Sequence, residues 1–297
     1  MTTFNLRCLY LHGVTPKLLS GGYRALLDML TFVIGGMTGV MLAVPPADFV
    51  LHNSLFLVAH FHNVIIGGVV FGSFAGISYW FPKAFGFKLA PFWGKISFWC
   101  WVLGFWCAFT PLYVMGLMGV TRRLRHFDDP SLQIWTLIAA FGALLILCGI
   151  LSFLIQIYVS IRDREALRDV TGDPWNGRTL EWSTSSPQPV YNFAFTPVVH
   201  DNDAWWDMKQ RGYARPLQGF KAIHMPSNTG VGVVLAGLSV CFGFAMIWYM
   251  WWLAALSFVG LLAVAIGHTF NYKRDFDLPV DAVVQAEGER TRLLARV

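Results

Sequence analysis

The sequence has few charged residues. Asp, Glu, Lys and Arg make up 13% of its 297 residues, against roughly 25% in an ordinary soluble domain. Hydrophobic residues account for 56% and aromatic residues for 16%, and the mean hydropathy is +0.53. Five stretches carry no charge at all: Met29–Ala47, Ser54–Phe81, Ile96–Thr121, Ser131–Ile161 and Ala222–Tyr272. This composition excludes a soluble globular protein and a nucleic-acid binder, and it makes membrane lipid the expected surroundings.

Cysteine is also scarce, and its spacing excludes two further classes of protein. The five cysteines show no CxxC pair, so neither a disulfide-stapled secreted domain nor a cysteine-based metal site is expected. Four of the five lie in the uncharged stretches, where free Cys behaves as a small hydrophobic residue.

The uncharged stretches have the length of membrane spans. A hydrocarbon core of about 30 Å needs roughly 20 apolar residues per helix. The stretch Ala222–Tyr272 is long enough for two helices, and its tryptophans near Tyr249–Trp252 suit a turn at the membrane interface. The sequence therefore predicts an all-α polytopic transmembrane bundle of about six spans: 26–44, 54–81, 96–119, 133–158, 230–248 and 250–268. These divide the chain into four spans in 29–161, a cytoplasmic connecting segment 162–229, a transmembrane hairpin 230–268 and a cytoplasmic tail 269–297.

One run of residues carries most of the chemical information. In Leu51–Asn63, three histidines stand at positions 52, 60 and 62, and ionisable residues within a span are costly and by default functional. At 100° per residue, His60 and His62 leave a helix about 200° apart, so they cannot share one tetrahedral metal ion. Each could bind a separate haem iron, for which imidazole is a normal axial ligand. The alternative is that both are core histidines with hydrogen bonds across helices.

A basic cluster follows the third predicted span. Arg122 and Arg123 are expected on the same membrane face as His52, which lies at the mouth of the histidine helix and could reach the polar edge of a cofactor. Guanidinium groups bind carboxylates in a bidentate manner, so these arginines suit haem propionates. The alternative is that these arginines lie at a helix end and extend their charged groups into water without binding a cofactor.

These residues resemble a known family. The pattern H-N-S-x-F-x-x-A-H-F-H-N at 52–63 is similar to the haem-ligand helix of subunit I of the haem–copper terminal oxidases, and the quinol-oxidising cytochrome bo branch is the most similar. Further matching segments lie between about Thr31 and Lys273: Gly35–Val40, Pro111–Tyr113, Thr121–Arg123, Asp173–Trp175, Arg178–Trp182, Ser185–Pro187 and Gly243–Trp248.

The resemblance implies a role for each candidate residue. His60 would be the catalytic residue, as proximal ligand of the high-spin, o-type haem iron. His62 would be an axial ligand of the low-spin, b-type haem iron. Arg122 and Arg123 would bind haem propionates, and His52 would lie near the propionate edge of the high-spin haem. Asp48 would lie close by.

The resemblance also implies a reaction and a setting. The family oxidises ubiquinol, reduces oxygen to water and pumps protons, together with subunits II, III and IV in the bacterial inner membrane.

Parts of the family pattern are missing. There is no H-P-E-V-Y-type motif and no adjacent His pair, so copper ligands are not expected in this chain. Residues 1–28 do not resemble the family and are expected to be an unrelated leader. We therefore expect part of a gene or one piece of a split subunit, inactive alone. A non-catalytic haem-binding anchor or electron-transfer subunit is the alternative, and a transporter ranks last because the spans other than the histidine helix carry almost no ionisable residues.

The distribution of Lys and Arg generates a topology prediction. Basic residues near the spans mark the cytoplasmic side, and most of them, including Lys88, fall on one side of a six-span bundle, opposite Arg125. Reporter fusions after residues 88 and 125 should therefore report opposite sides of the membrane, with 88 cytoplasmic. The same side for both fusions contradicts the predicted topology.

Overall fold

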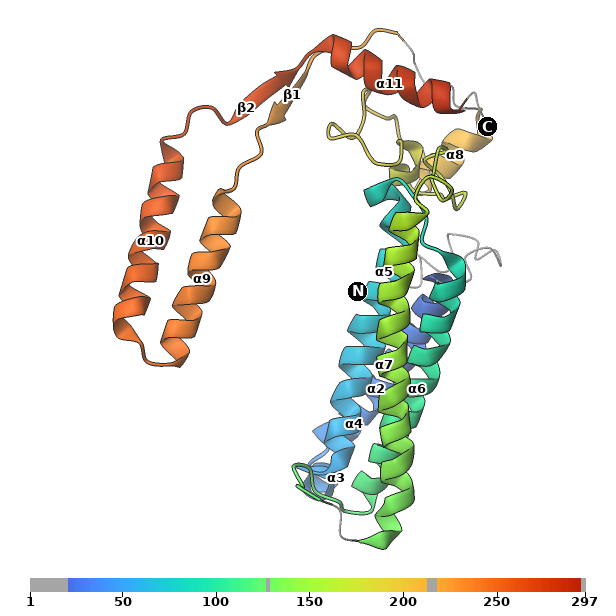
Figure 1. Cartoon of the computed structure of the whole chain (residues 1–297), viewed down its shortest axis with the longest axis vertical. Helices are drawn as coiled ribbons and strands as arrows, with labels where there is room; N and C mark the ends of the chain where they lie inside the picture. The colour runs from blue at the N-terminus through green and yellow to red at the C-terminus, as the bar shows by residue number, and fades with distance from the viewer. Residues whose placement is uncertain (1–20, 127–128, 213–217, 295–297) are drawn as a thin grey trace. The chain divides into compact units, whose positions relative to one another are not determined.

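The computed structural model describes residues 21–126, 129–212 and 218–294 (Figure 1). These residues form two compact units. One runs to Pro189 and includes Val198–Ala214, and the other consists of Val190–Pro197 and Arg215–Arg292. Each is described by itself.

The first unit is a bundle of apolar helices. Its elements are α2 (Gly21–Ala43), α3 (Pro45–Leu51), α4 (Leu55–Val64), the π-helical segment η2 (Ile65–Val70), α5 (Phe71–Phe85), α6 (Pro91–Leu117), the 3-10 turn η3 (Pro130–Leu132) and α7 (Gln133–Arg162). The chain bends by 101° between α2 and α3. Pro45 explains the bend, because a residue before proline is driven into the extended region, and Val44 has φ −89° and ψ 114°.

The helix that carries the histidines is continuous from Leu55 to Phe85. Ser54 caps its start, with the hydroxyl accepting a hydrogen bond from Phe56 N at 3.1 Å. Gly67 in η2 allows α2 to pack closely against this helix, because a Cβ at position 67 would lie only 2.6 Å from Thr31 Oγ1. Thr31 Oγ1 donates to Gly67 O at 2.9 Å. The helix ends at Phe85, four residues beyond the expected end at 81, and is capped by Gly86, which has φ +81°.

Glycines also allow α6 to pack closely on its neighbours. A Cβ on Gly116 would collide with the backbone of Phe56 in α4, and one on Gly142 would collide with the backbone of Ala108 where α7 crosses α6. Small residues at helix crossings let backbones approach in membranes, where no hydrophobic force drives helices together. These two positions fix how α6 lies between α4 and α7.

The second unit contains a helical hairpin, a strand pair and a terminal helix. Helices α9 (Val231–Ile247) and α10 (Trp251–Thr269) are antiparallel, and the chain reverses at Tyr249, which has φ +56°, as expected from the Trp-rich turn. Strands β1 (Ile223–Pro226) and β2 (Asp275–Leu278) pair antiparallel. His224 Nδ1 lies 2.9 Å from Asp277 Oδ1, a hydrogen bond that raises the pKa of His224.

Several elements differ from the sequence prediction. The strand pair, α11 (Val280–Leu294) and, in the connecting segment, η4 (Leu180–Ser183) and α8 (Ala204–Gln210) were not expected. They are short or polar, and a four-residue strand leaves little periodicity to detect.

Judged by helix length, the described residues also contain fewer membrane spans than the six expected. Among the described residues, four helices are long and apolar enough to cross a membrane, and a fifth span results if α2 and α3 are taken as one bent pair. All six expected segments are helical, but α9, with 17 residues, falls short of a full span.

The close contact at Gly116 generates a stability prediction. Gly116→Ala should destabilise the bundle by about 1–3 kcal/mol, the usual cost of overpacking, because the new methyl group has to displace the α4 backbone at Phe56. Gly36→Ala in α2 is the matched control, since a Cβ there meets nothing within 4 Å. Denaturant unfolding of the chain in mixed micelles measures both. A Gly116→Ala variant as stable as Gly36→Ala contradicts this packing.

Candidate haem-binding site

His60 leaves α4 on the side of α2. Its Nδ1 lies 3.0 Å from Thr38 Oγ1, and a Cβ on Gly39 would lie 2.9 Å from its Cε1. The imidazole therefore rests against the backbone of α2 where glycine leaves room for it. Its Nε2 has no hydrogen-bond partner among the described residues.

His62 leaves the same helix toward α6. Its ring stacks on Phe109 with centroids 4.5 Å apart and planes 18° apart. Nδ1 lies 2.8 Å from Val58 O, one turn earlier in α4. A carbonyl can only accept, so Nδ1 carries the proton and Nε2 keeps its lone pair. His62 is thus in the tautomer that binds a metal through Nε2.

The two histidines therefore face different helices. The 200° separation expected from their spacing appears as one ring on α2 and the other on α6. One metal ion cannot reach both rings, but a separate iron on each side of α4 can be reached by one of them. The histidine helix therefore offers one imidazole ligand to each iron.

The backbone of the arginine cluster is hydrogen-bonded to the start of the histidine helix. Arg122 N donates to Asn53 O at 2.9 Å, Leu55 N donates to Val120 O at 3.0 Å, and Ser54 forms a β-bridge with Thr121. The cluster and His52 therefore lie at the same end of the bundle, as the sequence predicted.

The two adjacent arginines differ in their surroundings. Arg122 is half-buried, and its Nε is buried without a hydrogen-bond partner among the described residues. Arg123 is exposed and has φ +69°, a conformation that costs energy for a residue other than glycine. An unpartnered buried guanidinium nitrogen suits a carboxylate that is not part of this chain.

Asp48 and His52 lie one helical turn apart at the mouth of the helix. His52 Nδ1 is 3.4 Å from Asp48 Oδ2, and the two side chains are 61% and 39% exposed. An exposed pair of this kind contributes little to stability. Both side chains remain accessible to a polar group of a cofactor.

At the C-terminal end of α5, opposite the arginine cluster, a buried lysine binds the backbone of the connecting segment. Lys83 is 6% exposed, and its Nζ donates to Gly172 O at 2.8 Å and to Thr184 O at 3.0 Å. Trp182, which is fully buried, donates from Nε1 to the hydroxyl of Tyr79 at 2.8 Å. The helix C-terminus and the carbonyl dipoles together stabilise the ammonium charge.

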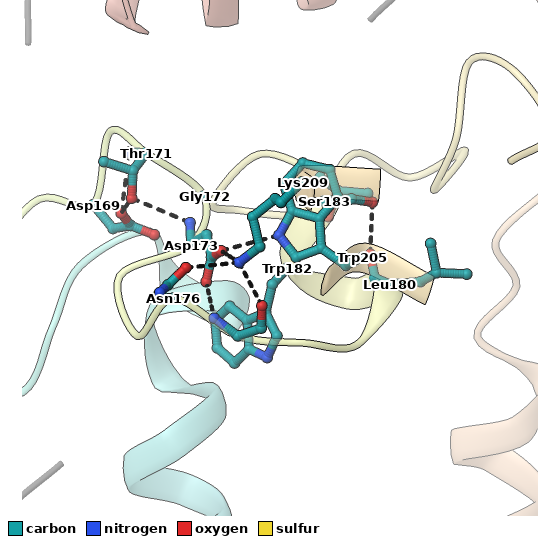
Figure 2. A network of polar contacts seen from close by, with 12 residues as sticks. Asp169, Thr171, Gly172, Asp173, Asn176, Leu180, Trp182, Ser183, Trp205 and Lys209 are labelled. Atoms are coloured by element: carbon teal, nitrogen blue, oxygen red, sulfur yellow. Dashed lines mark hydrogen bonds and ion pairs between the residues drawn. The ribbon is translucent and has the colours of Figure 1, made fainter. Parts of the chain in front are cut away.

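The family-like segments of the connecting segment form a polar network around Asp173 (Figure 2). Asp173 Oδ2 accepts from Trp205 Nε1 at 2.9 Å and from Lys209 Nζ at 3.0 Å. Lys209 Nζ also donates to Gly177 O at 2.6 Å. The network joins the loop to α8, and both bonds to Asp173 Oδ2 hold its carboxylate in place, so Asp173 serves to order the segment.

Sequence reasoning missed two side chains beside the histidines. Thr38 and Tyr113 lie in the segments Gly35–Val40 and Pro111–Tyr113, which supported the resemblance without being given a role. A hydroxyl facing an imidazole from another helix leaves no periodic signal, so only the motifs themselves could have identified them.

The other histidines in the described part of the chain do not add a ligand set. In the second unit, His224 has Nδ1 on Asp277 and Nε2 3.7 Å from Asp275 Oδ2. Within residues 21–126, 129–212 and 218–294, no three His, Cys, Asp or Glu side chains come together as a metal site. The electron-transfer anchor considered above, which needs a second axial ligand from this chain, gains no support from these positions.

Known proteins resemble most of the chain. The model of the family "Cytochrome C and Quinol oxidase polypeptide I" matches residues 8–145, so the expectation of an unrelated leader at 1–28 is wrong for residues 8–28. The ubiquinol oxidase subunit 1 of Acetobacter aceti is 55% identical over 280 residues, 92% of this chain and 42% of the relative. The cytochrome bo(3) ubiquinol oxidase subunit 1 of Buchnera aphidicola subsp. Schizaphis graminum is 53% identical over 88% of this chain and 40% of its own.

A third relative has a different electron donor in its name. The probable cytochrome c oxidase subunit 1 of Bradyrhizobium diazoefficiens is 50% identical over 92% of this chain and 41% of its own. A solved heme-copper terminal oxidase dimer matches 46% of this chain and 25% of its own with 23% identity and a TM-score of 0.41. The chain thus spans about 42% of the length of the first relative. It is a multi-pass membrane protein homologous to part of subunit I of the haem–copper oxidases, a family that binds haem.

Proposed function

We propose that this chain provides the haem-ligating helix of a ubiquinol-oxidising haem–copper oxidase. His60 would hold the iron of the high-spin, o-type haem, and His62 would hold the iron of the low-spin, b-type haem. Ligands from outside this chain would complete the low-spin haem site and the copper site.

The divergence of the two imidazoles carries this proposal. His60 faces α2 and His62 faces α6, and Nε2 of each has no partner among the described side chains. Core histidines, the alternative interpretation, would be expected to satisfy both ring nitrogens. A free Nε2 on both sides of one helix fits two ligands better.

Haem supplies a redox-active iron that accepts and passes on single electrons and, when one axial position is open, binds oxygen. The side chains of this protein hold and orient it. The Val58 carbonyl fixes the tautomer of His62, and Phe109 limits the rotation of its ring. A hydrogen bond from the ring nitrogen that does not bind the metal orients a histidine ligand and makes its other nitrogen more basic.

Arg122 is suited to bind a propionate of one of these haems. Its buried Nε lacks a partner among the described residues, and its backbone is tied to Asn53 at the start of the histidine helix. Arg123, His52 and Asp48 lie at the same end and complete the polar rim of the site.

The names of the relatives support the choice of electron donor, and the partner subunits are those that the resemblance to the family implies. Two of the three relatives carry ubiquinol oxidase in their names and one carries cytochrome c oxidase. We favour ubiquinol, with subunits II, III and IV as partners in a bacterial inner membrane and with proton pumping as in the family.

Haem stoichiometry tests the ligand assignment. The chain purified from haem-replete membranes should bind about two haems weakly, with one protein ligand for each iron. His60→Leu and His62→Leu should each lose about one of them, and the reduced spectra that remain should differ from one another. His268→Leu, at the end of α10, is the control and should lose none.

Two results contradict the assignment. If neither variant at 60 or 62 lowers the haem content, the two are core histidines. If His268→Leu lowers it equally, the loss reports a general defect and not ligation.

The propionate role generates a separate prediction. Arg122→Leu should lower the reduction potential of a bound haem by roughly 60 mV, a tenfold change in a one-electron equilibrium, because a cation beside the haem stabilises the reduced form. Arg125→Leu, an exposed neighbour, should shift it far less. Redox titration followed by absorbance measures both, and equal small shifts favour arginines that merely reach into solvent.

A further inference from the structure

The hydroxyl of Thr38 is the meeting point of three helices. Thr38 Oγ1 in α2 lies 2.9 Å from Gly35 O in the same helix, 3.0 Å from His60 Nδ1 in α4 and 3.2 Å from the hydroxyl of Tyr113 in α6. Thr38 is half-buried, so these contacts lie inside the bundle.

The protons of this cluster can be assigned. A threonine hydroxyl has one proton and two lone pairs. Gly35 O can only accept, so the proton of Thr38 points to it. Both lone pairs then accept, one from His60 Nδ1–H and the other from the hydroxyl of Tyr113. In this arrangement every donor has an acceptor, and the lone pair of His60 is on Nε2.

The rotation of the ring is restricted as well. Gly39 lies one residue after Thr38, and a Cβ there would be 2.9 Å from His60 Cε1. The ring is therefore held by a hydrogen bond on one side and by the backbone of α2 on the other.

The two histidines have different supports. His62 donates to a carbonyl of its own helix, so its tautomer is set within α4, and Phe109 of α6 adds a stacking contact with the ring. His60 donates to a hydroxyl of another helix, which in turn accepts from a third. The orientation of His60 thus depends on how α2, α4 and α6 are packed.

We propose that Thr38, supported by Tyr113, is a positioning residue that holds His60 as the Nδ1-protonated tautomer and aims its Nε2 at an iron. This inference rests on the proposed function for the iron, whereas the tautomer belongs to the chain itself. Neither hydroxyl touches the iron. Both act through the imidazole.

The test uses the full chain in lipid nanodiscs with 15N-labelled histidine. NMR distinguishes protonated from unprotonated ring nitrogens, so the tautomer ratio of His60 is measured without haem. Thr38→Val removes the hydroxyl and keeps the shape, and it should lower the preference for Nδ1–H by about two- to tenfold, the equivalent of one ordinary hydrogen bond. Tyr113→Phe should give a smaller change in the same direction.

Two controls separate this role from a general packing effect. Thr38→Ser retains the hydroxyl and should restore the ratio. Thr136→Val removes a hydroxyl in α7 that bonds only to Gln133 O in its own helix, and it should change nothing. The signals of His62 should be the same in all variants. If Thr38→Val does not insert into the membrane, Tyr113→Phe carries the test.

Haem binding gives the second measurement. In chain loaded with haem b, the iron–histidine stretching frequency of the His60 site should shift in Thr38→Val and return in Thr38→Ser. An unchanged tautomer ratio in Thr38→Val, or no restoration by serine, overturns the inference even if His60 binds iron. If His60→Leu leaves haem content unchanged while the tautomer responds to Thr38, the proposed function fails and the positioning role stands.

Discussion

Two histidines separated by one residue on a helix cannot face the same way, and the rest of this molecule depends on that constraint. Because α4 turns by about 200° between His60 and His62, each side of the helix needs its own neighbour. Helix α2 takes one side, where Gly39 makes room for an imidazole, and α6 takes the other, where Phe109 stacks on a second. The close helix contacts at Gly67 and Gly116 keep those two neighbours in place.

Both ends of the histidine helix are anchored by hydrogen bonds in addition to apolar contacts. At its start, the backbone of Asn53–Leu55 pairs with Val120–Arg122, so the arginine cluster cannot move independently of the histidines. At its end, Lys83 and Tyr79 bind the loop that contains Trp182. In a bilayer the association of helices gains little from the hydrophobic effect. Directed polar contacts at the two ends therefore set the position of the helix along its axis.

The sequence predicted the helical segments well because lipid imposes length and apolarity, both visible residue by residue. It also predicted that His60 and His62 diverge and that Arg122 lies near His52, because these follow from helix period and from which spans meet at one face. It did not predict Thr38 against His60, the strand pair β1–β2 or the segment around Asp173. Those depend on contacts between residues far apart in the chain, and a single sequence contains no signal for such pairs.

The polar residues of the connecting segment show why a shared motif need not belong to an active site. Asp173, Arg178 and Trp182 all lie in segments that resemble the oxidase family. Asp173 is occupied by Lys209 and Trp205, Arg178 pairs with Asp203 at 3.0 Å, and Trp182 is buried on Tyr79. Ion pairs and hydrogen bonds of this kind order a loop, although Arg178 also keeps a buried Nε without a partner among the described residues. What assigns the binding role to the end of the bundle that carries α4 is that two imidazoles and one guanidinium with an unpartnered nitrogen each lie on this helix or are bonded to its start.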